Sequence, residues 1–208
     1  MPARPIVRLG HPALRTPARP VAPEELAEPA TQALIDDLIE TMRGAAGVGL
    51  AAPQVGVGLQ LFVYEAALRE GGRDRSIPLH AVINPMLTPQ GGELVYDWEG
   101  CLSIPDLRGL VPRHPAVRVR GLDRSGQPLD YVATGFEARI VQHEFDHLHA
   151  VVFLDRMRDM KTLAFYDEWE RYMVGDGTHP PEVGSSVEEP GAPLPEKPEG
   201  EPGGAELL

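Results

Sequence analysis

Two histidines flank a glutamate in the segment His143-Glu144-Phe145-Asp146-His147. On a helix, side chains four residues apart lie one above the other, so both imidazoles can bind one metal ion. Glu144 then falls beside the metal, where a carboxylate can act as the base for a metal-bound water. The spacing therefore predicts a metal-dependent hydrolase, although H-E-x-x-H is a short pattern that requires support from the rest of the chain.

A tetrahedral catalytic metal site takes three protein ligands and keeps one position for water, so a third ligand is required. Cys101 is one candidate, and as the single cysteine in 208 residues it cannot form an internal disulfide. Glu168 is a second candidate, because it follows His147 by 21 residues, the spacing of a thermolysin-like enzyme. The metzincin pattern fails, since Ala150 and Phe153 stand where it requires Gly and His.

The histidine motif has a helical context. Thr134-Gly135-Phe136-Glu137 has the form of a capping box, which predicts a helix start at this point. Beyond it, four residues fall at spacings of four, three and four, which predicts one stripe facing the protein interior. These residues are Phe136, Ile140, His143 and His147.

The chain resembles the peptide deformylases. Three of the family's motifs occur in its order, and the similarity covers roughly residues 5 to 174. The motifs are Gly47-Val48-Gly49-Leu50-Ala51-Ala52-Pro53-Gln54, Glu99-Gly100-Cys101-Leu102-Ser103 and Gln142-His143-Glu144-Phe145-Asp146-His147-Leu148.

The resemblance implies roles for the chemistry-bearing residues. Cys101, His143 and His147 would bind one divalent metal. Fe²⁺ is the expected ion, and Zn²⁺, Ni²⁺ or Co²⁺ are alternatives. Glu144 would be the general base, and the Gln54 side chain and the Leu102 backbone amide would hold the carbonyl oxygen. A thiolate and two neutral imidazoles suit a borderline metal, and such a site lowers the pKa of a bound water toward neutrality.

The family removes the formyl group from the N-terminal formyl-methionine of nascent proteins, so the expected partners are N-formylmethionyl peptides near the ribosome. Val48, Phe136 and Ile140 are predicted to form an apolar slot for the methionine side chain. The backbone at Gly49 is expected to act as an edge for the substrate strand. Arg108 matches a family position near the peptide backbone.

One position departs from the family pattern. Three residues after the second histidine the family usually has Gly, where a left-handed residue ends the helix, and Ala150 stands there. An alanine at positive φ costs on the order of 1 kcal/mol, so we expect a rearranged helix end.

Length and composition predict one enzyme domain with a tail. Hydrophobic residues make up 42% of the chain and charged residues 24%, as in globular domains. Residues 1–174 are expected to form the deformylase-like catalytic domain. Residues 175–208 contain seven prolines, seven glycines and eight acidic residues against Lys197. Such a segment buries too little apolar surface to order itself, so we predict a disordered acidic tail.

The hydrophobic periodicity predicts an α+β fold in which antiparallel sheets surround the metal-binding helix. Helices are expected at Ala27 to Arg43, ending at Gly44, and at Met160 to Val174. Arg69 to Ser76 is expected to be a loop, and Asp123 to Gly126 a hairpin turn. The predicted strands are Leu59 to Tyr64, Ala81 to Leu87, Glu93 to Trp98, Val117 to Leu122 and Leu129 to Ala133.

The formal net charge of −12 argues against direct nucleic-acid binding. Met1 to Gly10 has no apolar core of a signal peptide, and no run approaches membrane-spanning length. We therefore expect a cytoplasmic enzyme with no membrane partner. Two other functions stay open: a metallopeptidase with Glu168 as third ligand, and an inactive metal-binding paralogue that acts as an interaction module through the acidic tail.

Overall fold

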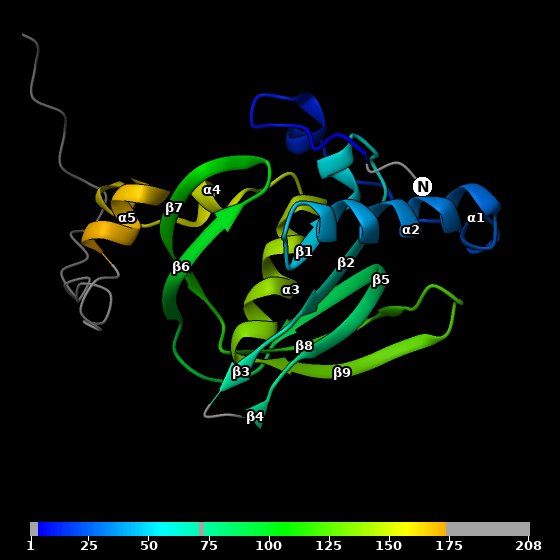
Figure 1. Cartoon of the computed structure of the whole chain (residues 1–208). Coiled ribbons are helices and arrows are strands. Elements are labelled where there is room, and N and C mark those ends of the chain that lie inside the picture. Colours follow the sequence, from blue (N-terminus) through cyan, green and yellow to red (C-terminus); the bar gives the residue numbers. More distant parts are fainter. Residues whose placement is uncertain (1–3, 71–72, 174–208) are drawn as a thin grey trace, which may run out of the picture.

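Helix α3, Gly135–Leu148, runs through the middle of the molecule between two antiparallel sheets (Figure 1). The computed structural model describes residues 4–70 and 73–173, so the predicted tail at 175–208 lies outside the described residues. The predicted α+β class, with antiparallel sheets around the histidine-bearing helix, is confirmed. None of the helices in the described ranges has the length and apolar character that crossing a bilayer requires.

The larger sheet has five strands in the order β1-β2-β5-β8-β9, and every neighbouring pair is antiparallel. Four of its strands were predicted from alternating apolar residues, and β1 was not. Asp123 makes the turn between β8 and β9, where its carboxylate accepts the backbone N–H groups of Ser125 and Gln127. The strands are β1 Gly49–Ala51, β2 Leu61–Ala66, β5 Ile77–Pro89, β8 Ala116–Leu122 and β9 Pro128–Thr134.

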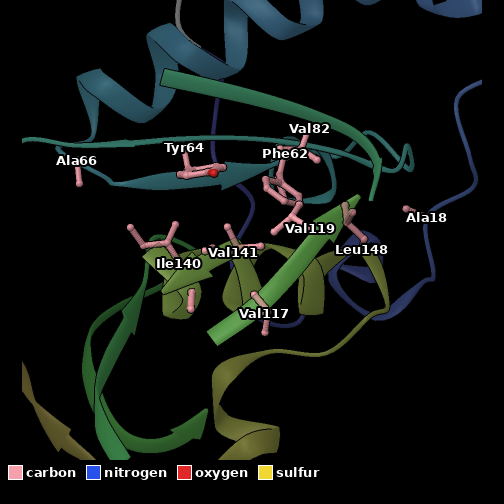
Figure 2. Packing of buried hydrophobic residues seen from close by; sticks show 13 residues of the cluster. Ala18, Phe62, Tyr64, Ala66, Val82, Val117, Val119, Ile140, Val141 and Leu148 are labelled. Carbon is pink, nitrogen blue, oxygen red and sulfur yellow. The ribbon is translucent and has the colours of Figure 1, made fainter. Parts of the chain in front are cut away.

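At β2 both faces of this sheet are buried, which explains why this strand is apolar on both sides. Successive strand residues point to opposite faces. Leu61 and Val63 pack in the cluster formed with helix α2, Pro29–Gly44, whose predicted apolar face is confirmed. Phe62 and Tyr64 pack instead in the cluster formed with α3 (Figure 2). The sheet thus holds α3 firmly on one side.

The smaller sheet has the order β10-β7-β6 and carries Cys101 at one strand end. Its strands are β6 Val95–Cys101, β7 Ile104–Arg113 and β10 Ala164–Phe165. Cys101 pairs with Ile104 across a two-residue turn, so the cysteine lies where β6 reverses into β7. A third apolar cluster, which includes Val111 and Phe153, packs beneath this sheet. Strand β7 was not predicted.

Short helical segments complete the chain and contribute few core residues. They are η1 Pro12–Arg15, α1 Pro23–Leu26, η2 Ala52–Val55, α4 Phe153–Arg156 and η3 Met160–Thr162. The predicted loop at Arg69 to Ser76 is wrong in part, since β3, Arg69–Glu70, pairs there with β4, Arg73–Asp74.

The predicted C-terminal helix from Met160 to Val174 is shorter than expected. A helix is present, but α5 covers only Tyr166–Tyr172, and Val174 lies outside the described residues. The Asp159 side chain caps η3 by accepting the Lys161 N–H. Ala164 and Phe165 then pair with β7 as an added strand. Pairing with a distant strand overrides the local helical pattern here.

The predicted capping box at the start of α3 is wrong. Thr134 occupies the N-cap position, but its side chain makes no cap hydrogen bond. Gly135 has a φ of 56°, and its N–H donates to the Pro115 carbonyl at 2.8 Å. Glu137 accepts the Tyr64 hydroxyl at 3.0 Å instead of reaching back to the N-cap. The helix entry is therefore determined by contacts with the sheet.

The end of α3 keeps the usual left-handed cap although the residue is an alanine. Ala150 has a φ of 62°. The Val151 N–H donates to the Asp146 carbonyl at 3.0 Å and the Ala150 N–H to the His147 carbonyl at 3.3 Å, which is a Schellman arrangement. The expected rearrangement of the helix end does not occur, so the alanine is held in a strained conformation.

Ala150→Gly should therefore stabilise the protein by about 1 kcal/mol, because glycine adopts this φ without steric cost. Ala45→Gly is the matched control, since Ala45 ends α2 with a φ of −93° and glycine there gains nothing. Chemical denaturation of both variants checks the prediction. An equal loss of stability in both would show that Ala150 is not strained.

Candidate metal centre

The two predicted histidines and the predicted cysteine meet at the centre of the molecule. His143 and His147 extend from one face of α3 toward the turn that carries Cys101. Their ligand atoms all lie within 4.8 Å of one another, and the Cys101 sulfur is 3.3 Å from His147 Nε2. A tetrahedral ion with one thiolate and one imidazole ligand would hold these atoms about 3.6 Å apart. The donor set and its spacing therefore fit a divalent metal.

The protonation state of His147 suits ligation. His147 is 1% exposed, and burial lowers the pKa of its imidazole well below the ordinary value. Burial also acts to lower the pKa of His143, but hydrogen bonds with Cys101 and Glu99 raise it well above the ordinary value. The Glu99 carboxylate lies 2.9 Å from His143 Nδ1, which leaves Nε2 of that ring as the ligand atom.

A buried ionic network surrounds Glu99. Glu99 is 5% exposed. Its carboxylate accepts two hydrogen bonds from Arg113, both at 2.9 Å, and one from Arg139 at 2.8 Å. Burial acts to raise the pKa of Glu99, but hydrogen bonds from Arg113 and His143 lower it below its usual range. Arg113 also donates to Asp146 at 2.5 Å. A charged carboxylate is thus held behind one histidine of the cluster.

Glu144 lines the same cavity as Cys101 and His143 and is 4% exposed. Burial raises the pKa of its carboxyl to about 7. Oε2 of this carboxyl has no hydrogen-bond partner in the part of the chain that the structure describes. Gly49 lies against it, because a Cβ at Gly49 would overlap the carboxyl group. Glycine at this position leaves room for the glutamate.

Gln54 folds back to the cysteine from the first turn of η2, as the resemblance required. Its Oε1 accepts the Ala51 N–H at 2.8 Å, which directs the amide nitrogen away from its own loop. Nε2 then lies 3.5 Å from the Cys101 sulfur and 3.3 Å from the Ser103 hydroxyl. Leu102 follows the cysteine in the turn, and its side chain packs where a Cβ on Gly47 would stand. Both donors proposed for the carbonyl oxygen lie beside the cluster.

A cavity of about 490 Å³ opens onto this group and brings the predicted site residues together. Those that line it are Val48, Gly49, Gln54, Cys101, Leu102, Arg108, Phe136, Ile140, His143 and Glu144. His147 is not among its lining residues. The inward stripe of α3 is confirmed for Ile140 and both histidines, but Phe136 is 44% exposed because it stands in the first turn of the helix. Val48 is 39% exposed.

Several residues of the site were not found from the sequence. Glu99 belongs to the motif Glu99-Gly100-Cys101-Leu102-Ser103, yet the sequence predicted no role for it. Trp98, Asp106 and Arg139 also line the cavity. Glu99 could have been found from the sequence, because it is a charged residue in a strand of largely apolar and aromatic residues. The rival ligand Glu168 is exposed on α5 and does not line the cavity, so the geometry gives the thermolysin-like alternative no support.

The family model described as polypeptide deformylase matches residues 3–163. The chain belongs to this family. It is 42% identical over 165 residues to peptide deformylase 1 of Nitrosomonas europaea, a match that covers 79% of this chain and 93% of that protein. It is 45% identical over 161 residues to peptide deformylase 2 of Bordetella bronchiseptica, with 77% and 90% covered. The chain is therefore a metal-dependent hydrolase of the deformylase family.

Solved deformylase structures share the fold. A Met-Ala-Ser-bound class I type b peptide deformylase from Acinetobacter baumannii superposes with a TM-score of 0.70 at 34% identity, covering 75% of this chain and 99% of that one. A Synechococcus elongatus deformylase in complex with actinonin gives 0.69 at 35% identity, covering 82% and 86%. The family removes formyl groups from nascent peptides with a single divalent metal.

Glu99→Gln should weaken metal binding by about 10-fold to 100-fold, because the neutral amide no longer orients and polarises His143. It should also lower the free energy of unfolding by about 3 kcal/mol, since Arg113 and Arg139 lose a buried counter-charge. Competition with a chromogenic chelator and chemical denaturation measure the two effects.

Asp130→Asn is the control, because it removes the exposed ion pair with Arg118 and should change neither quantity appreciably. Metal affinity equal to that of the unmodified chain in Glu99→Gln would show that the carboxylate only contributes to folding.

Proposed function

We propose that this deformylase hydrolyses the formyl group of N-terminal formyl-methionine with one divalent ion bound by Cys101, His143 and His147. The meeting of these three donors beside the cavity that Cys101, His143 and Glu144 line is the observation that carries the proposal. Fe²⁺ is the proposed native ion, and Zn²⁺, Ni²⁺ and Co²⁺ suit the same donor set. When bound there, the ion would supply the Lewis acidity that makes water a nucleophile near neutral pH.

Glu144 is the proposed general base. Its carboxyl is buried beside the cluster, and its raised pKa lies close to physiological pH, where proton transfer in both directions is efficient. Glu144 would take a proton from the attacking water and pass it to the amine of methionine as the C–N bond breaks. Formate and a free N-terminal methionine are the products.

Gln54 and Leu102 are proposed to hold the former formyl oxygen while negative charge grows on it. The Gln54 amide nitrogen faces the cysteine because its oxygen is engaged by the Ala51 N–H. The backbone N–H of Leu102 adds a second donor at the turn. Donors that are oriented before the reaction stabilise such charge without reorganisation.

Substrate binding is proposed along β1 and the first turns of α3. Among the described strands, β1 lies at the edge of its sheet with β2 as its one neighbour, so Gly49 can pair with an extended peptide. Val48, Phe136 and Ile140 would enclose the methionine side chain, and Arg108 would contact the peptide that follows. The Met-Ala-Ser peptide bound to the Acinetobacter relative supports a peptide ligand of this kind.

The proposed substrates are nascent chains that begin with formyl-methionine. The enzyme would bind them near the ribosome in the cytoplasm. The cavity bears two exposed apolar side chains at its rim, Val48 and Phe136, and holds its catalytic carboxyl in the interior, which suits a flexible peptide end. The alternative of an inactive paralogue is opposed by the simultaneous presence of Gln54, Glu144 and all three donors.

Turnover of formyl-Met-Ala-Ser by anaerobically prepared, iron-loaded protein tests the proposed function. Glu144→Ala should retain the metal and lose about 10² to 10⁴ in rate, because its carboxylate transfers protons and is not a ligand. Formate release and metal content are measured on the same samples. Loss of the metal in this variant, or turnover close to normal, would contradict the assigned role.

Gln54→Leu should lower kcat by about 10² to 10³, the effect of losing one oxyanion donor, with a smaller change in KM. Gln54→Glu provides a second variant, since it keeps an oxygen for the Ala51 N–H and removes the N–H donor. Both variants should keep their metal. If Gln54 only supports its own loop, Gln54→Leu will lose thermal stability while kcat stays within a few-fold, and Gln54→Glu will be active.

A further inference from the structure

The guanidinium of Arg108 is held in place by two aromatic side chains of α5. Its central carbon lies 4.8 Å from the ring centroid of Tyr166 and 5.9 Å from that of Trp169. Nη1 donates to the Leu107 carbonyl at 3.0 Å. A Cβ at Gly100 would overlap the guanidinium, so glycine leaves space for it next to the metal cluster. The orientation of Arg108 is therefore determined from three sides.

Arg108 has no carboxylate partner in the described part of the chain. The other arginine of the cavity wall, Arg139, donates to Glu99 and to the Val95 and Val111 carbonyls. A guanidinium carries five N–H donors, and among the described residues Arg108 uses them on a single acceptor, the Leu107 carbonyl. Arg108 is thus an oriented cation whose remaining donors can bind oxygen atoms of a ligand in the cavity.

Helix α5 supports a second wall residue as well. Trp169 packs edge-on against Trp98 with ring centroids 6.1 Å apart, and Tyr166 packs on Trp169 at 5.5 Å. Trp98 and Arg108 both line the cavity. The polypeptide deformylase match ends at residue 163, so this aromatic support lies in the segment that follows it.

The position of Arg108 indicates what it binds. The guanidinium lies over Gly100, one residue before the metal-cluster cysteine. An extended peptide advances about 3.3 Å per residue. A peptide whose formyl group reaches Cys101 therefore brings the residues after methionine within reach of Arg108, and their exposed acceptors are main-chain carbonyl oxygens or a terminal carboxylate.

We propose that Tyr166 and Trp169 are positioning residues that orient Arg108 to bind the backbone oxygens of the peptide residues that follow formyl-methionine. Helix α5 is then part of the substrate site and acts through Arg108. This inference rests on the proposed function, because it requires a formyl peptide in the cavity.

Steady-state kinetics of the full-length, iron-loaded enzyme on formyl-Met-Ala-Ser and formyl-Met-Ala test the proposal. Trp169→Ala and Arg108→Ala should each raise KM for the longer peptide by about tenfold, the loss expected for one charged hydrogen bond, while kcat stays within about twofold. The increase should be smaller for the shorter peptide. Trp169→Phe should restore most of the affinity, because it keeps an aromatic ring beside the guanidinium.

The double variant Arg108→Ala/Trp169→Ala separates positioning from general packing. If Trp169 acts through Arg108, the double variant should be no worse than Arg108→Ala alone. Tyr172→Ala is the matched control, since Tyr172 is a 69% exposed aromatic residue of the same helix that contacts Arg171. It should leave both kinetic constants unchanged.

Additive losses in the double variant, or a fall in kcat with unchanged KM, would overturn the proposal. Arg108→Lys tests it with α5 intact, because lysine keeps the charge but not the planar stacking. A normal KM in Arg108→Lys would also overturn it. Failure of the unmodified enzyme to hydrolyse either peptide would overturn the proposed function together with this inference, whereas turnover with additive effects would overturn this inference alone.

Discussion

The buried carboxylate of Glu99 is the constraint on which the site depends. It belongs to β6, while its partners Arg113 and His143 lie on β7 and α3. Removing a carboxylate from water is unfavourable unless several donors replace the solvent, so Glu99 requires both arginines of its network. The same carboxylate orients the first histidine of the cluster. The smaller sheet and α3 can therefore pack together only in the arrangement that also assembles the three metal donors.

Close backbone approaches complete this arrangement. Gly49 makes room for Glu144 on the side of the larger sheet, and Gly100 makes room for Arg108 on the side of the smaller one. Helix α3 presents its histidines between them because the apolar cluster with Phe62 and Val141 fixes its position on the sheet. The candidate site thus lies where two sheets meet one helix. Helix α3 contributes the two histidines and Glu144, the smaller sheet contributes Cys101, and the larger sheet contributes the close approach of Gly49.

The sequence predicted those parts of the molecule that depend on local spacing. The H-E-x-x-H helix, the alternating strands and the hairpin turn at Asp123 follow from periodicities of a few residues. Strand β7 was missed because Pro105, Gly109 and Pro112 interrupt its pattern. The prediction of a capping box at Thr134 was wrong because Glu137 accepts a hydrogen bond from the distant Tyr64. The prediction of a long C-terminal helix was wrong because Ala164 and Phe165 pair with the distant strand β7. The aromatic support of Arg108 depends on such distant contacts and left no spacing signal.

X-ray absorption at the iron edge tests whether Cys101, His143 and His147 hold the catalytic ion. We expect one sulfur and two imidazole nitrogens around one iron per chain. In Cys101→Ser the sulfur signal should be lost and binding sharply weakened, because a neutral hydroxyl replaces a thiolate. Glu168→Ala should give the spectrum of the unmodified protein. A coordination sphere without sulfur, or full occupancy in Cys101→Ser together with metal loss in Glu168→Ala, would show that Cys101 is not a ligand of the ion.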